Sequence, residues 1–163
     1  MADGQLRDRP DQRSVAAIRA AWIARERRQA FLFSAHTDST KDEHATLQGL
    51  LDDHGSTHAA TILTARLEDP TGYGRIVRLA DGEVGGIVEH KDADSDQREI
   101  DEINSGMYAF AGDRLADCLG RLTTDNVQGE EYLTDVIGMM RGDGDTVAAA
   151  LCGDADEIGR AHV

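Results

Sequence analysis

The sequence predicts a single α/β domain in which a β-sheet that includes a hairpin packs against helices. Three observations support this expectation. From residue 44 onward, apolar runs with strand patterning alternate with segments whose apolar residues recur at helical spacing. An Asp-Gly pair separates two of the strand-like runs, which is typical of a tight hairpin turn. The 163 residues, 40% of them hydrophobic, are enough for one buried core without a disulfide or metal.

The first 43 residues differ in composition from the rest of the chain. They contain eight basic and seven acidic residues, a net charge of +1, whereas residues 44–163 contain nine basic and 24 acidic residues, a net charge of -15. A solvated amphipathic helix is predicted over Ser14 to Ala30, and an acidic partner for it is the alternative. The apolar run Phe31 to Phe33 and a polar loop to Glu43 follow. The apolar stripe of the predicted helix consists of Val15, Ile18 and Trp22.

Three more helices are predicted where apolar residues recur at helical spacing. The first precedes a break at Gly55, and the second follows an expected N-cap at Asp113. The residues at these spacings are Leu47, Leu50, Leu51 and His54 in the first helix, Leu115, Cys118, Leu119 and Leu122 in the second, and Leu133, Val136, Ile137 and Met140 in the third.

The predicted strands lie between these helices. Ala59 to Leu67 is the first, and Met107 to Phe110 is a short strand further on. Gly74 to Leu79 and Glu83 to Glu89 flank the turn and form the hairpin, and Val147 to Leu151 is the final strand. Strands that alternate with helices indicate an α/β domain whose sheet carries an added hairpin.

The chain is strongly acidic, with a net charge of -14 and a pI near 4.6. Nucleic acid and anionic membrane are therefore not expected partners, because affinity for them depends on clustered Lys and Arg. No apolar run approaches the ~18 residues of a membrane span, and the N-terminus lacks a signal-peptide core. Cys118 and Cys152 do not have the spacing of a zinc site and favour a reducing compartment. A soluble cytoplasmic protein is expected.

Local signatures alone name no enzyme. The sequence contains no phosphate-binding P-loop, dinucleotide-binding glycine motif, serine-hydrolase elbow or zinc-protease helix. The acidic stretch Asp92 to Glu102 has enough carboxylates for a hard cation but lacks the order of a calcium loop, so a solvated charged loop is expected. The histidines occur singly and are expected at surface or turn positions: His36, His44, His54, His58, His90 and His162.

Four longer strings, in their order and spacing, carry a specific resemblance. They are DPTGYGRIVR at Asp69 to Arg78, GIVEHKDA at Gly86 to Ala93, QREIDEINSGMYAF at Gln97 to Phe110, and TTDNVQGEEYLTDVI at Thr123 to Ile137. They closely resemble the uridylyltransferase domain of the bacterial bifunctional N-acetylglucosamine-1-phosphate uridylyltransferase/glucosamine-1-phosphate acetyltransferase family. The resemblance runs from about Ala45 to Glu157.

The resemblance implies a Rossmann-like (GT-A-like) nucleotidyltransferase fold with a mixed sheet and an added hairpin, incomplete at both ends. Residues 44–157 are then the sugar-binding side of a partial uridylyltransferase domain. Residues 1–43 are an unmatched Arg-rich segment, for which a frame slip is one hypothesis, and residues 158–163 are expected to be a non-native tail. The family trimerises through its acetyltransferase domain, which has no counterpart in this sequence.

The resemblance also implies an activity: synthesis of UDP-N-acetylglucosamine and pyrophosphate from UTP and N-acetylglucosamine 1-phosphate with Mg2+, for cell-wall peptidoglycan. Gly74 is implied to present its backbone N–H to the sugar, and Glu89 to accept hydrogen bonds from sugar hydroxyls. Asn104 is implied to contact the sugar or its phosphate. Tyr132 and Thr134 lie in a string that borders the sugar site.

Each residue also has a purely structural interpretation. Gly74 suits a strand bend, Glu89 an exposed strand end, and Asn104 a loop in which it satisfies backbone groups. Tyr132 suits simple packing, and Lys91, although close to Glu89 in sequence, is expected to be a surface charge. These alternatives stay open at the level of the sequence.

The nucleotide side of the family pattern is absent. The family's glycine-rich phosphate loop, its lysine, its uracil string and the two strings that supply the metal-binding Asp and Asn do not occur in this sequence. We therefore expect no retained catalytic residue, no metal ligand and no turnover. Two alternatives to this family assignment are another sugar-1-phosphate nucleotidyltransferase and a non-catalytic module that binds sugar phosphates or a partner.

Overall fold

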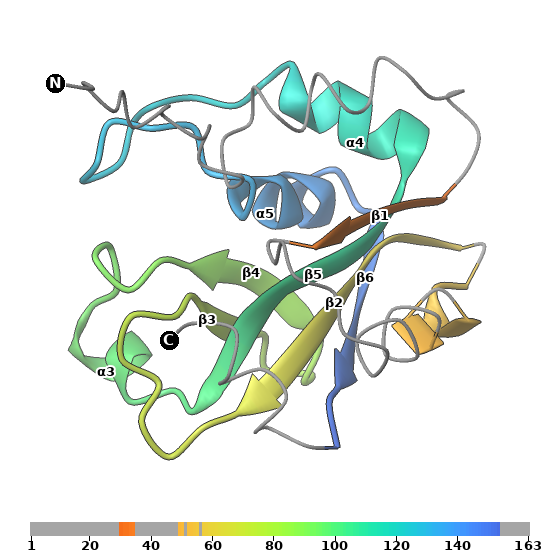
Figure 1. The fold of residues 1–163 in the computed structure, drawn as a ribbon. Helices are drawn as coiled ribbons and strands as arrows, with labels where there is room; N and C mark the ends of the chain where they lie inside the picture. The colour runs from red at the N-terminus through yellow and green to blue at the C-terminus, as the bar shows by residue number, and fades with distance from the viewer. Residues whose placement is uncertain (1–29, 35–48, 51, 56, 154–163) are drawn as a thin grey trace, which may run out of the picture.

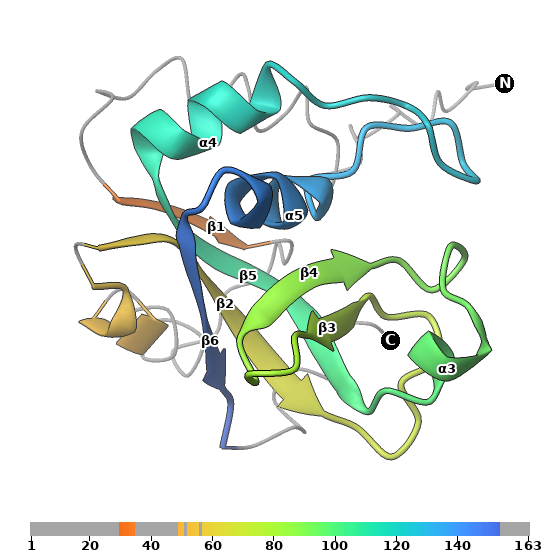
Figure 2. The same cartoon turned by 180° about the vertical axis from the view of Figure 1, so that it is seen from behind.

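The computed structural model describes residues 30–34, 49–50, 52–55 and 57–153. They form a six-stranded mixed sheet with helices α4 and α5 against one face (Figure 1, Figure 2). The strands are β1 (Ala30–Ser34), β2 (His58–Arg66), β3 (Arg75–Arg78), β4 (Val84–Val88), β5 (Glu102–Ala111) and β6 (Thr146–Leu151). The helices are α3 (Ser95–Arg98), α4 (Gly112–Leu119) and α5 (Asp135–Gly142).

The strand order is β4-β3-β5-β2-β6, with β1 as an additional partner of β5. Strands β2 and β6 are parallel, and every other pairing is antiparallel. One edge of β5 pairs with β2. The opposite edge pairs first with β3 at Ile103 and then with β1 from Met107 to Ala111. The predicted α/β class with an added hairpin is confirmed, and β5 is the strand around which the sheet is organised.

Strand β5 is longer than the sequence predicts. The expected strand was Met107 to Phe110, whereas β5 begins at Glu102. Its first half contains Asn104, Ser105 and Gly106, which favour turns and hide a strand pattern. Pairing on both edges overrides these local preferences.

Gly106 marks a bulge in β5. Ile62 of β2 pairs with Tyr108 and Thr64 pairs with Asn104, so a step of two positions along β2 corresponds to a step of four positions along β5. The φ angle of Gly106 is 81°, a conformation that glycine adopts without steric cost. The Asn104 side chain lies against this bulge, since its amide contacts both Gly106 and Tyr108.

The predicted hairpin is confirmed. Strands β3 and β4 pair antiparallel from Arg75 opposite Val88 to Arg78 opposite Val84. Gly82 has a φ of 86°, as a tight turn after Asp81 requires.

Helices α4 and α5 cover the face of the sheet that carries the larger core. This core unites residues from both helices and five strands: Ala59, Ala60, Ile62, Ile76, Val84, Tyr108, Phe110, Leu115, Cys118, Leu119, Leu122, Leu133, Val136, Ile137, Met140 and Val147. The expected N-cap at Asp113 is wrong, because α4 begins at Gly112 with Ala111 as its N-cap. Leu122 and Leu133 are buried as predicted but lie outside the helices, since α4 ends at Leu119 and α5 begins at Asp135.

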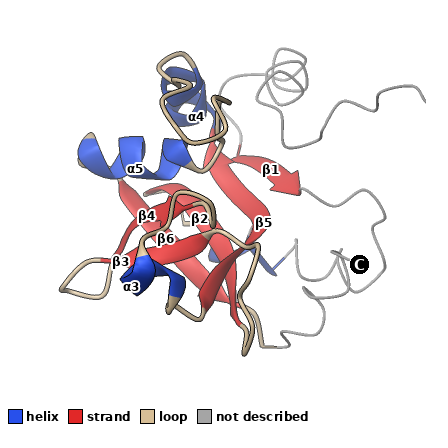
Figure 3. Ribbon diagram, turned by 90° about the vertical axis from the view of Figure 1, so that its left-hand side faces the viewer, coloured by secondary structure: helices blue, strands red, loops and turns tan. Residues whose placement is uncertain are grey.

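A second, smaller core lies on the opposite face of β2 and β5. It consists of Leu50, Leu63, Ala65, Ile103, Met107 and Ala109. Residues 49–50 and 52–53 are helical, which confirms the described part of the helix predicted to end at His54. Figure 3 shows α4 and α5 together on one side of the strands. Alternation along β5 explains the two cores, because Tyr108 and Phe110 face the helices while Met107 and Ala109 face away.

The helix predicted over Ser14 to Ala30 lies outside the described residues except at Ala30, which is the first residue of β1 and not helical. The tail predicted after residue 157 also lies outside the described ranges. Among the described residues, no helix is long and apolar enough to cross a membrane.

The expectation of a wholly solvated acidic loop is wrong at its end. Asp94 caps α3 by accepting a hydrogen bond from the Gln97 backbone N–H at 2.8 Å. Glu102, in contrast, is only 4% exposed. Its carboxylate accepts two hydrogen bonds of 2.7 Å from the Arg78 guanidinium and one of 3.0 Å from the Thr64 hydroxyl. This bidentate pair joins β2, β3 and β5, so its geometry explains why an acidic residue occurs inside the sheet.

The Glu102 pair makes stability depend on pH. Burial pushes the pKa of Glu102 up, but the hydrogen bonds from Arg78 and Thr64 outweigh burial and hold this pKa below its ordinary value. A lowered folded-state pKa stabilises the fold above the unfolded-state pKa of about 4.3, and this stabilisation is lost as the pH falls.

We therefore expect Glu102→Gln to lower the free energy of unfolding by about 1 to 2 kcal/mol at neutral pH. This loss is smaller than for a fully buried charged pair, because the Arg78 side chain is 39% exposed and solvent screens the interaction. The difference from the unsubstituted chain shrinks in acid, where the carboxylate is protonated. Urea unfolding at neutral pH and at about pH 3 measures it. Glu99→Gln, at an exposed position, is the matched control. An equal loss at both pH values would contradict the assignment of this pair.

Candidate functional site

Four of the five predicted sugar-site residues come together where the β3–β4 hairpin, β5 and the start of α5 meet. Gly74 directly precedes β3, Glu89 directly follows β4, Asn104 lies in β5 and Thr134 directly precedes α5. They come from segments up to 60 positions apart, from 74 to 134. We call this group of four the hairpin site.

Gly74 has an ordinary backbone conformation, because its φ is not positive. The reason for a glycine at this position is the space that a Cβ atom would occupy. A Cβ atom at this position would lie 3.1 Å from Cγ2 of Ile87, 3.5 Å from Oε1 of Glu89 and 3.7 Å from Cβ of Asn104. Its carbonyl accepts a 2.9 Å hydrogen bond from the Asn104 backbone N–H. The glycine therefore keeps open the space in front of Glu89 while its own backbone is fixed to β5.

Glu89 is held by Thr134. The Thr134 hydroxyl donates a 2.9 Å hydrogen bond to Oε1 of Glu89, across 45 positions of sequence. Thr134 is 6% exposed, whereas Glu89 is half-buried. Since an ionised carboxylate can accept about four hydrogen bonds, Glu89 keeps acceptor capacity beyond the one that orients it. The structure thus gives Thr134 a defined contact, which the sequence did not.

Asn104 is fixed by the bulge. Its Oδ1 accepts a 3.0 Å hydrogen bond from the Gly106 backbone N–H, and its Nδ2 donates to the Tyr108 hydroxyl at 2.5 Å. The amide oxygen of Asn104 therefore satisfies a backbone N–H, as the structural interpretation predicts, whereas the amide nitrogen does not. The amide nitrogen has a second N–H for another acceptor.

Tyr132 lies beside this group. Its hydroxyl accepts a 2.7 Å hydrogen bond from Nε2 of Gln128. Burial raises the pKa of Tyr132, and the negative charges of Asp92 and Glu89 add to this effect although the Gln128 bond opposes it. Tyr132 thus lies within electrostatic reach of the hairpin site. Lys91 is exposed and donates to Gln128 at 2.7 Å, which confirms its surface position.

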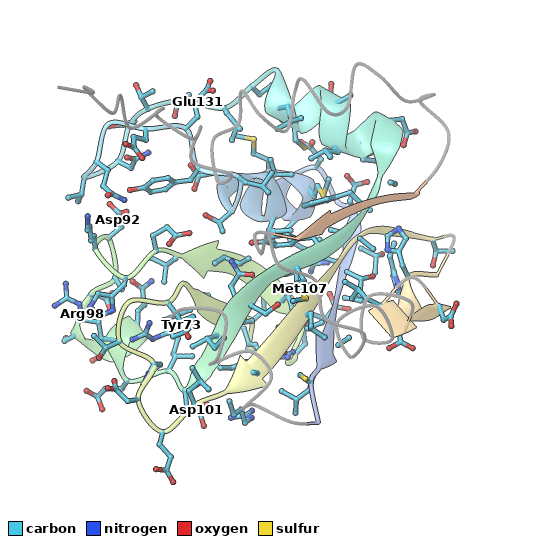
Figure 4. The ribbon with its side chains drawn as sticks, viewed as in Figure 1. Tyr73, Asp92, Arg98, Asp101, Met107 and Glu131 are labelled. Carbon is cyan, nitrogen blue, oxygen red and sulfur yellow. The ribbon has the colours of Figure 1, made fainter. Side chains whose placement is uncertain are left out.

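Two carboxylates next to the hairpin site were not predicted from the sequence. Asp92 is half-buried and accepts a 2.9 Å hydrogen bond from the Val127 backbone N–H, which holds the segment 123–132 against the end of the hairpin (Figure 4). Burial raises the pKa of Asp135, and the charges of Glu89 and Asp92 raise it further. Both residues lie inside the resembling strings, but only the fold reveals that they converge on Glu89.

One group of potential metal ligands occurs elsewhere in the described part of the chain. Asp117, Cys118 and Asp143 place ligand atoms within 4.8 Å of one another. The Arg121 guanidinium binds Asp143, lies 3.2 Å from the Asp117 carboxylate and donates to the Cys118 sulfur at 3.4 Å. These donors are therefore already satisfied by a cation of the protein, and they do not fit a Mg2+ ion.

A mixed sheet with a parallel β2–β6 pair, an added hairpin and two helices on one face, with the hairpin site at the hairpin's end, defines a fragment of the Rossmann-like nucleotidyltransferase class. The chain is similar to bifunctional protein GlmU of Thermobifida fusca, with 55% identity over 115 residues, 70% of this chain and 24% of that protein. Over this part the chain belongs to the GlmU family.

Other GlmU proteins match equally well. The identity is 56% with the Streptomyces coelicolor protein over 69% of this chain and 54% with the Corynebacterium efficiens protein over 69% of this chain. In both cases the chain covers 24% of the relative. The chain thus spans about a quarter of the length of the curated relatives it matches. No protein-family model matches the chain.

The bond between Thr134 and Glu89 can be tested without a ligand. We expect the double-mutant cycle of Thr134→Val and Glu89→Ala to give a coupling energy of about 1 kcal/mol, as for one hydrogen bond to a charged group at a half-buried site. Urea unfolding of the four proteins measures it. Thr123→Val, at an exposed position, is the control partner and should show no coupling with Glu89→Ala. A coupling near zero for Thr134 would mean that Glu89 is not oriented by this contact.

Proposed function

We propose that this chain binds N-acetylglucosamine 1-phosphate, and the sugar of UDP-N-acetylglucosamine, at the hairpin site. In this proposal it is the sugar side of a uridylyltransferase that makes UDP-N-acetylglucosamine and pyrophosphate from UTP and N-acetylglucosamine 1-phosphate. The convergence of Gly74, Glu89, Asn104 and Thr134 at one place, in a segment similar to GlmU proteins, carries the proposal.

The geometry of the hairpin site supports a proposed role for each residue. Gly74 lets the sugar ring approach the backbone, because any side chain would fill the space in front of Glu89. Glu89, oriented by Thr134, accepts hydrogen bonds from sugar hydroxyls. Asn104 donates its remaining amide N–H to the sugar or its phosphate. Tyr132 borders the site at one side.

Nucleotide and metal binding belong to the complete enzyme in this proposal. Mg2+ would there neutralise charge on the phosphates during uridylyl transfer. The one described group of potential ligands is bound by Arg121, so the described residues do not fit Mg2+ and we derive no step through it. The contribution of this chain is to bind and orient the sugar phosphate. A cytoplasmic location and assembly into a trimer are further parts of the proposal for the complete protein.

Binding of N-acetylglucosamine 1-phosphate to the full 163-residue chain tests the proposal. We expect Glu89→Ala to weaken binding by about 10- to 150-fold, because it removes charged hydrogen bonds worth about 1.5 to 3 kcal/mol. NMR titration of labelled protein measures the dissociation constant. Glu68→Ala, an exposed acid outside the hairpin site, is the control. No binding by the unsubstituted chain, or equal binding by Glu89→Ala, would overturn the proposal.

Gly74→Ala tests the requirement for open space. The added methyl would lie 3.1 Å from Cγ2 of Ile87 and 3.5 Å from Oε1 of Glu89. We expect at least about a tenfold loss of sugar-phosphate affinity, since displacement of a binding group by about 1 Å has large effects. Gly142→Ala, where an added Cβ would meet nothing within 4 Å, is the matched control for the same titration. Unchanged affinity in Gly74→Ala would show that the sugar does not approach this backbone.

A further inference from the structure

Arg75 is an unusual buried cation. It is 1% exposed and is the largest fully buried side chain among the described residues. In the part of the chain that the structure describes, no carboxylate forms an ion pair with it, and its Nε has no hydrogen-bond partner. Asp69 acts on its charge only at longer range. Burial of a guanidinium without a paired carboxylate costs free energy. A stabilising ion pair therefore does not explain why Arg75 is buried.

The guanidinium instead binds three separate segments of chain. Nη1 donates to the Tyr73 carbonyl, and Nη2 lies 3.4 Å from Nδ1 of His90 and donates to the Arg98 carbonyl at 3.4 Å. Tyr73 is the neighbour of Gly74, and His90 is the neighbour of Glu89. Arg98 is the last residue of α3. Arg75 therefore holds the chain next to two members of the hairpin site at once.

The side chain of Arg75 lies on the far side of the hairpin from the hairpin site. Arg75 pairs with Val88, and residues that pair across two strands share a face. Ile87 faces the opposite way, toward the space that a Cβ of Gly74 would enter together with Glu89. Arg75 thus cannot touch a ligand bound in front of Glu89, and any effect on binding must pass through the backbone.

We propose that Arg75 is a positioning residue: its buried guanidinium fixes the spacing between the Gly74 and Glu89 segments from behind the hairpin, and so sets the affinity for the sugar phosphate. This inference rests on the proposed function. It assigns Arg75 no contact with the ligand.

The test compares Arg75→Met, Arg75→Lys and Arg78→Met in the full-length chain. Arg78 lies on the same strand but pairs with Glu102, so Arg78→Met destabilises the fold away from Gly74. We measure the dissociation constant for N-acetylglucosamine 1-phosphate and, without ligand, hydrogen exchange of the Asn104 amide that bonds to the Gly74 carbonyl. We expect Arg75→Met to bind the sugar phosphate about tenfold or more weakly and its Asn104 amide to exchange faster than in the unsubstituted chain. We expect Arg75→Lys to lie between Arg75→Met and the unsubstituted chain in both measurements, because lysine lacks the planar guanidinium fork. Arg78→Met should stay within about twofold in affinity.

The outcomes separate the two proposals. If the unsubstituted chain binds and Glu89→Ala does not, but Arg75→Met binds normally, the positioning role is overturned while the proposed function stands. If Arg78→Met loses as much affinity as Arg75→Met, the loss reflects general stability and the positioning role is also overturned. If Arg75→Met does not fold, unchanged affinity and exchange in Arg75→Lys overturn it. No binding by the unsubstituted chain overturns the proposed function and, with it, the role of Arg75.

Discussion

The pairing of β5 with three strands is the constraint on which the remaining structure depends. One edge of β5 is occupied by β2 and the other is divided between β3 and β1. Because β3 pairs only at the start of β5, the hairpin is displaced toward that end of the sheet. The bulge at Gly106 lies between the two pairings, and the Asn104 side chain is held there by hydrogen bonds to Gly106 and Tyr108. The strand thus determines the path of the hairpin and supplies the contacts that hold a side chain of the hairpin site.

The sequence predicted those elements whose local signals agree with the final fold. The turn at Gly82 and the helical spacing around Leu115 and Val136 are examples, since turn chemistry and burial act there in the same direction. The first half of β5 was missed because Asn104 and Gly106 disfavour a strand locally, and only pairing with two neighbours makes them part of one.

The residues that the resembling strings single out lie together in the fold, but their contacts could not be predicted from the sequence. The contacts of Gly74, Glu89 and Asn104 depend on long-range packing. The bond from Thr134 to Glu89 spans 45 positions, and the proximity of Asp135 to Glu89 arises only when α5 packs on β4. Two buried charged residues also have partners that the sequence does not reveal. Glu102 is neutralised by Arg78, whereas Arg75 is surrounded by carbonyl and imidazole acceptors, and sequence alone does not distinguish the two environments.

Under the proposed function, the distribution of the hairpin site over four chain segments links sugar-phosphate binding to the folding equilibrium. The unfolded chain does not hold Gly74 and Thr134 close together, so a ligand that contacts both segments binds only the native state. Such a ligand stabilises the native state by about 2.7 kcal/mol at a free concentration of 100 times its dissociation constant. For a domain of this size that gain raises the melting temperature by several degrees. The melting temperature of the chain is therefore expected to report whether a ligand occupies the hairpin site.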